Sequence, residues 1–91
     1  MTPEEYLEAV RAVAGQASDY LPEERLANVR SLIEHGEPAE GLCSLAWVIV
    51  TDGVLVPRNV ITAIRDFTDG IVEQEFMPPN LEYFVLPEPA P

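Results

Sequence analysis

Apolar residues recur three or four positions apart in four separate segments of the chain, the spacing that places side chains on one face of an α-helix. Each segment begins at a proline, whose fixed φ and missing N–H suit the first turn of a helix. These prolines are Pro3, Pro22, Pro38 and Pro57. The pattern predicts an all-α protein, a compact four-helix bundle with helices at about 3–17, 22–35, 38–51 and 57–72.

Local signals support the ends of these helices. Thr2 and Glu5 have the Thr-x-x-Glu spacing of a capping box at the first helix. Gly36 and Gly53 follow the second and third apolar patterns, where a glycine commonly ends a helix. Gly70 is expected to weaken the last turn of the fourth helix.

The third predicted helix has the widest apolar surface. Leu42, Leu45 and Ile49 belong to its main stripe, and Cys43 and Trp47 extend that stripe to one side. We therefore expect it to be the central helix. Trp47 stands at the edge of the apolar arc, where it would serve either as a core residue or as an anchor for a partner.

Two segments do not follow the helical pattern. The link 54–56 is expected to be an extended connector that packs on the core, because no other strand is apparent as its partner. Beyond Glu75, Asn80 would cap a single turn that closes the end of the bundle. Alternate prolines then predict an extended, flexible tail at 87–91, so that a single helical domain covers 1–86.

The charge of the chain is strongly one-sided. Of its 91 residues, 16 are acidic and five are arginines, there is no lysine, and the formal net charge is −11. Nucleic acid is an unsuitable partner, because phosphates are bound by clustered Lys and Arg side chains. A basic protein surface is the natural complement, since a field of one sign speeds encounter with the opposite charge.

The sequence lacks the features of membrane-inserted and secreted proteins, which bears on the expected cellular compartment. No apolar run approaches the roughly 18 residues that span a bilayer, so no membrane insertion is expected. The first residues lack the basic start and apolar stretch of a secretion signal. Cys43 is the only cysteine and has no disulfide partner within the chain. These features favour the cytoplasm.

The chain has few residues of the kinds that catalyse reactions or bind metals. His35 is the only histidine, and its place just before Gly36 favours hydrogen bonding to the last carbonyls of a helix over catalysis. One histidine and one cysteine do not supply a zinc site, and no glycine-rich phosphate loop is present. We therefore expect no enzymatic activity, no metal and no cofactor.

One acidic stretch is a candidate for binding a basic partner. The turn between the second and third predicted helices is acidic, and no basic residue occurs between Arg30 and Arg58. The candidate partner-binding residues in and beside this stretch are Glu34, Glu37, Glu40, Trp47 and Asp52.

The stretch 35–46, with its Gly-Glu turn and Leu-x-x-Leu-Ala core, followed by a short link and the helix at 57–64, resembles small helical immunity proteins of bacterial polymorphic toxin systems, in particular the Maf-type immunity family. The likeness covers about residues 26–84. Glu37 and Asp52 match the family in character, whereas Trp47-Val48 and Thr51 depart from it. The resemblance implies a protein that binds a cognate toxin domain, expected to be a basic nuclease, and blocks it without chemistry of its own.

A different class of function stays open. The chain would also suit a small adaptor, or a homodimeric subunit of a complex unrelated to toxins. In that hypothesis the wide apolar arc of the third helix forms the seam between two copies.

Overall fold

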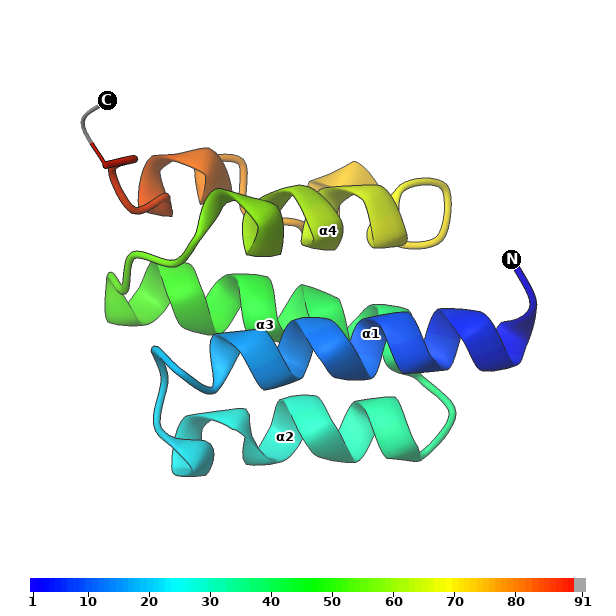
Figure 1. Ribbon diagram of the computed structural model, residues 1–91. Coiled ribbons are helices and arrows are strands. Elements are labelled where there is room, and N and C mark those ends of the chain that lie inside the picture. The colour runs from blue at the N-terminus through cyan, green and yellow to red at the C-terminus, as the bar shows by residue number, and fades with distance from the viewer. Residues whose placement is uncertain (90–91) are drawn as a thin grey trace.

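The computed structural model describes residues 1–89, and in this part of the chain the predicted all-α four-helix bundle is confirmed (Figure 1). Its helices run alternately in opposite directions, with short connections between them. They are α1 (Pro3–Ala17), α2 (Glu23–Glu34), α3 (Pro38–Asp52) and α4 (Arg58–Thr68). Two 3-10 turns follow, η1 (Gln74–Phe76) and η2 (Leu81–Phe84). Among these helices none combines the length and the apolar character needed to span a membrane.

The helix starts agree with the prolines to within one residue. The Thr2–Glu5 capping box at the start of α1 is present, with hydrogen bonds of 3.1 and 3.0 Å. Pro3 and Pro38 occupy the first turns of α1 and α3, as predicted. Pro22 and Pro57 instead precede their helices, because their ψ angles of 149° and 148° are extended rather than helical.

The predicted end of the fourth helix, at residue 72, was wrong. The helix ends at Thr68, because Asp69 is extended and Gly70 adopts a left-handed φ of 75° that a helix does not accommodate. The N–H groups of Ile71 and Val72 then turn back to the carbonyl oxygen of Thr68, at 3.0 and 2.9 Å. This turn brings Val72, which is 6% exposed, into the core.

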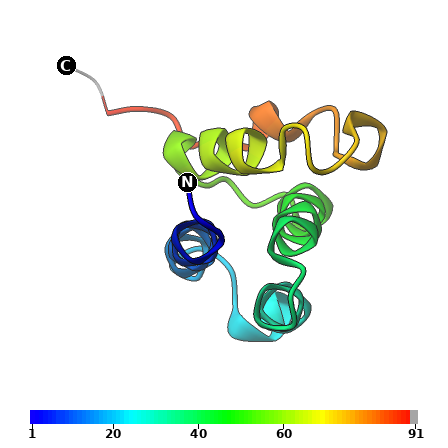
Figure 2. The same cartoon turned by 90° about the vertical axis from the view of Figure 1, so that its right-hand side faces the viewer.

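Helix α3 is the central helix, as its wide apolar arc predicts. It packs against α1, α2, α4 and η2 (Figure 2). Leu42, Leu45 and Ile49 are fully buried, and Cys43 is nearly so. Other elements of the same chain therefore cover most of the arc, and Trp47 is its exposed part.

Helices α2 and α3 approach closely at Gly41. A Cβ atom at this position would lie 2.6 Å from Cγ1 of Ile33 and 3.0 Å from the carbonyl oxygen of Val29. Real Cβ atoms do not come so close to other atoms, so only glycine lets the two backbones meet at this distance. Gly41 is thus a packing residue near the start of α3.

The segment after α4 folds back over the bundle instead of leaving it. Met77 and Leu81 are buried, so the turn after Asn80 packs on the core as expected, but the Asn80 side chain makes no capping hydrogen bond. The link before α4 does find a strand-like partner, contrary to expectation: Val56 donates to the carbonyl oxygen of Phe84 at 2.9 Å and accepts from Leu86 at 2.8 Å. Residues 87–89 are exposed, and the last two positions of the predicted tail lie outside the described residues.

Candidate functional site

All five arginines form ion pairs with carboxylates of the same chain. Two of the pairs join neighbouring helices, and two join α4 to the C-terminal segment. Most of these side chains are substantially exposed, so each pair contributes little stability, but together they occupy every arginine. The pairs are Arg11 with Glu8 (2.7 Å) and Glu34 (2.6 Å), Arg25 with Asp52 (2.8 Å), Arg30 with Glu23 (2.9 Å), Arg58 with Glu88 (3.0 Å) and Arg65 with Glu82 (2.6 Å).

The carboxylates outside these pairs gather at one end of the bundle. Six of the 16 acidic side chains are paired, and ten are not. The alternating helix directions place the start of α1, the α2–α3 turn and the end of α4 at the same end (Figure 2). Eight of the ten belong to these segments, to the loop after α4 and to η1, and we call them the acidic end: Glu4, Glu5, Glu37, Glu40, Asp66, Asp69, Glu73 and Glu75.

The structure separates the residues that the sequence grouped as candidates. Glu37 and Glu40 lie at the acidic end without an ion pair. Glu34 lies there too, but it is bound through both oxygens by Arg11 at 2.8 and 2.6 Å, which lowers its pKa. Asp52 is at the opposite end of α3, roughly 20 Å away at 1.5 Å per residue. Arg25 binds it there and lowers its pKa.

Trp47 lies midway along α3, where it meets the C-terminal segment. Its indole N–H donates to the carbonyl oxygen of Phe76 at 2.7 Å, and Sγ of Cys43 lies 3.4 Å from the same oxygen. The Trp47 side chain is still 43% exposed, so it is neither a core residue nor a free surface residue. Phe76 is 60% exposed and was not singled out from the sequence, because nothing local links it to Trp47.

The contact with Phe76 also shields the only thiol. Cys43 is 8% exposed. Burial raises the pKa of its thiol, and the negative charge of Glu40 raises this pKa further. Cys43 is therefore held as a neutral thiol, which is a poor nucleophile.

His35 has the structural position predicted for it. It follows the last residue of α2, and its Nδ1 lies 2.7 Å from the carbonyl oxygen of Ser31. One ring nitrogen is thus engaged at the end of the helix. Among residues 1–89, no three His, Cys, Asp or Glu side chains are arranged to hold a metal ion.

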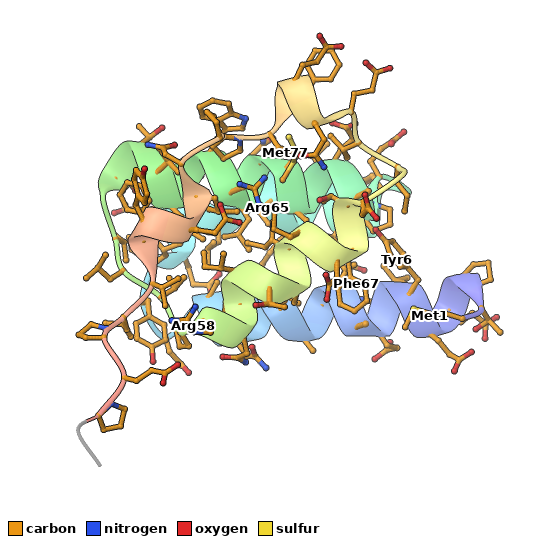
Figure 3. The ribbon with its side chains drawn as sticks, turned by 90° about the horizontal axis from the view of Figure 1, so that it is seen from above. Met1, Tyr6, Arg58, Arg65, Phe67 and Met77 are labelled. Atoms are coloured by element: carbon orange, nitrogen blue, oxygen red, sulfur yellow. The ribbon has the colours of Figure 1, made fainter. Side chains whose placement is uncertain are left out.

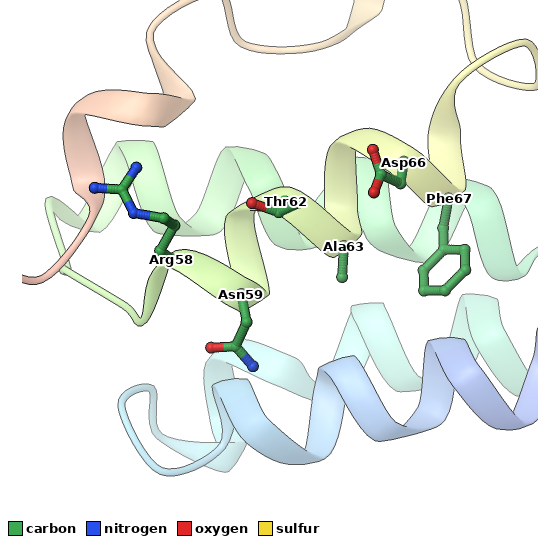
Figure 4. Close-up of a pocket in the computed structure, with 6 residues that line it drawn as sticks. All are labelled: Arg58, Asn59, Thr62, Ala63, Asp66 and Phe67. Carbon is green, nitrogen blue, oxygen red and sulfur yellow. The ribbon is translucent and has the colours of Figure 1, made fainter.

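A shallow hollow of about 560 Å³ lies along α4. Figure 4 shows Asn59, Ala63 and Phe67 on the side of α4 that faces α1, with Asp66 turned away from α1. The amide of Asn59 donates to Oε1 of Gln16 at 2.9 Å and so links the two helices. The hollow is lined mainly by apolar atoms and contains no pair of groups suited to nucleophilic or acid–base chemistry.

The acidic end is therefore the most distinctive surface feature of the described chain, and the exposed ring of Trp47 is the most distinctive single side chain beside it. Comparison with known proteins does not add to this picture: no protein-family model matches the chain, and no match was found among curated proteins or among solved structures.

Proposed function

We propose that the protein is a non-enzymatic binding module whose acidic end contacts a basic surface on a protein partner. The observation that carries this proposal is the pairing of all five arginines. No arginine is left to neutralise the acidic end, and eight carboxylates there are without an ion pair. A partner with clustered Lys and Arg side chains would supply the missing charge.

Electrostatics gives such a surface a kinetic advantage. Clustered charges of one sign steer an oppositely charged partner and raise its association rate, by up to several orders of magnitude at low salt. The effect weakens once the Debye length falls to about 8 Å at physiological ionic strength. Association with this protein should therefore be fast and strongly dependent on salt.

The likeness of residues 26–84 to Maf-type immunity proteins suggests which partner this is. We propose a toxin domain, basic and of nuclease type, that the protein binds and blocks stoichiometrically. Nuclease sites are basic because they hold phosphates, so an acidic protein is attracted to them as the substrate is. We place the interaction in the cytoplasm, where an unpaired thiol such as Cys43 stays reduced.

The acidic end is tested by a matched pair of charge reversals. In the first variant Glu37 and Glu40 are changed to Lys, and in the second Asp19 and Glu24, which are unpaired carboxylates near the other end. Each variant changes the net charge equally, and each alters one carboxylate in the first turn of a helix, Glu40 in α3 or Glu24 in α2. The helix-dipole cost of Glu40→Lys and of Glu24→Lys is therefore similar. Glu37→Lys places a cation at the N-cap of α3 and Asp19→Lys places one just after the end of α1, so the helicity of both variants is checked by circular dichroism.

The measurement is the association rate constant with the C-terminal domain of the protein encoded next to this chain's gene, at low and at high salt. We expect the first variant to associate at least about tenfold more slowly than the second at low salt, with the difference shrinking as salt rises. Equal rates for the two variants would refute a role for the acidic end.

The toxin hypothesis has a separate test in cells. The same neighbouring domain should stop growth when it is produced alone, and co-production of this chain should restore growth. A domain that binds without being toxic would instead favour the adaptor hypothesis. A domain that is toxic but neither binds nor is suppressed would reject the immunity function.

A further inference from the structure

Trp47 and Phe76 are two exposed aromatic residues, which we call the aromatic pair, and a hydrogen bond from the Trp47 indole to the backbone carbonyl of Phe76 joins them. The indole N–H is the only polar group of the Trp47 side chain, and it is already satisfied by the carbonyl oxygen of Phe76 at 2.7 Å. What the two side chains present to solvent, 43% of Trp47 and 60% of Phe76, is therefore apolar ring. Exposed aromatic side chains are typical anchors of protein interfaces.

Carboxylates of the acidic end border this aromatic pair. Glu75 is the chain neighbour of Phe76, and Glu40 lies two turns before Trp47 on the same face of α3. Glu40 is close enough to Cys43 to raise the pKa of that thiol, and Cys43 contacts the same Phe76 carbonyl as Trp47. The apolar pair is thus continuous with unpaired negative charge.

We propose that Trp47 and Phe76 are an anchor subsite that accepts an apolar side chain from a cationic segment of the partner, while basic side chains of that segment bind Glu40 and Glu75. This inference rests on the proposed function and adds a second kind of contact to it. The negative charge of Glu40 and Glu75 beside the aromatic pair favours a cationic segment as the ligand, because such a segment neutralises both carboxylates. A second copy of this chain, with a net charge of −11, would add to their repulsion.

The probes are two synthetic peptides of equal length and equal charge, neither containing tryptophan. One consists of arginine and glycine, and the other of arginine and leucine. Trp47 is the only tryptophan of the chain, so its fluorescence reports on this site alone. We expect the arginine–leucine peptide to bind roughly tenfold more tightly, to shift the Trp47 emission to shorter wavelength and to protect it from acrylamide quenching.

A matched pair of variants assigns the effect to the subsite. Phe76→Ala removes an exposed ring but keeps the carbonyl that accepts from Trp47, so the fold should be retained. It should abolish the preference for the arginine–leucine peptide and leave the affinity for the arginine–glycine peptide unchanged. Tyr83→Ala, which removes a ring that is 82% exposed on η2, should keep the preference.

The outcomes separate this inference from the proposed function. Equal affinity for both peptides with unchanged Trp47 emission would overturn the anchor subsite and leave binding at the acidic end in place. Failure of both peptides to bind at low salt would overturn the proposed function as well. A shift of Trp47 emission with protein concentration alone, together with a dimer in sedimentation, would show that a second copy covers the subsite and would overturn the proposal.

Discussion

Tyr6 and Phe67, which are 61 residues apart in the chain, make two contacts with each other (Figure 3). Their rings pack edge to face with centroids 5.8 Å apart, and the Tyr6 hydroxyl donates to the carbonyl oxygen of Phe67. That carbonyl belongs to the last turn of α4, where it has no partner within the helix. The Tyr6 side chain, at the start of α1, therefore packs against α4 and also supplies a hydrogen-bond donor to a free carbonyl oxygen at the end of α4.

Tyr6→Phe should keep the ring contact and remove the hydrogen bond. We expect a loss of about 1 kcal/mol in the free energy of unfolding, measured by urea denaturation. Tyr83→Phe is the control, because the Tyr83 side chain is mostly exposed, and it should change the stability by no more than measurement error. Equal effects of the two substitutions would show that the Tyr6 hydroxyl contributes nothing specific.

Gly41→Ala should destabilise the bundle, because the new Cβ atom would collide with Ile33 and with the backbone of α2. We expect a loss of about 1–3 kcal/mol in the free energy of unfolding. Gly15→Ala is the matched control in α1, where an added Cβ meets no atom within 4 Å. That control should gain up to about 1 kcal/mol, since alanine favours the helix. A neutral Gly41→Ala would contradict the close packing of α2 and α3.

The ion pair of Arg65 with Glu82 should make stability depend on pH in the acid range. The Arg65 side chain, 24% exposed, is the least exposed arginine, and it donates to both Glu82 oxygens and to the carbonyl oxygen of Pro78 (Figure 3). These hydrogen bonds lower the pKa of Glu82 in the folded protein. The folded state therefore binds a proton less readily than the unfolded chain, and the stabilisation is present above the unfolded pKa of about 4.3.

Glu82→Gln tests this relationship. At neutral pH the variant should lose up to about 1 kcal/mol in the free energy of unfolding, since the pair lies near the surface. The difference from the wild type should disappear as the pH falls through the lowered pKa of Glu82. In Glu88→Gln both partners of the affected pair are mostly exposed, so no measurable loss is expected at either pH. A difference that persists in acid would assign the effect of Glu82→Gln to packing.

Two truncations should distinguish the docked part of the C-terminal segment from the exposed part. Removal of residues 87–91 breaks only the exposed pair of Arg58 with Glu88 among the ion pairs, so the thermal midpoint should barely change. Removal of residues 81–91 also takes away Leu81, which is fully buried, and the backbone pairing with Val56. We expect a loss of at least about 3 kcal/mol for the longer truncation, measured by denaturant unfolding.

Much of the bundle could be predicted because its signals are local. Pro3 and Pro38 mark helix starts, Gly36 and Gly53 adopt the left-handed φ expected after a helix, and the arc around Leu42 identifies the central helix. These features depend on residues within one or two turns of each other. Sequence periodicity is therefore enough to find them.

The candidate site was only partly predictable, because charge pairing is a tertiary property. The acidic stretch from Glu34 to Asp52 has no arginine within it, yet Arg11 and Arg25 reach its two outer members from other helices. The contact of Trp47 with Phe76 depends in the same way on how the C-terminal segment folds back. Only the alternating helix directions show that the α2–α3 turn, the start of α1 and the end of α4 share one end of the molecule.

Because every arginine is paired within the chain, salt should have two opposite effects on this protein. Free in solution, the carboxylates of the acidic end repel one another, and no arginine is free to relieve the repulsion. Added salt should therefore raise the thermal midpoint of the isolated protein. In a complex with a cationic partner the repulsion is already relieved, and added salt should lower the affinity. The thermal midpoint of the free protein and its affinity for the partner, measured over the same range of sodium chloride concentrations, should therefore move in opposite directions.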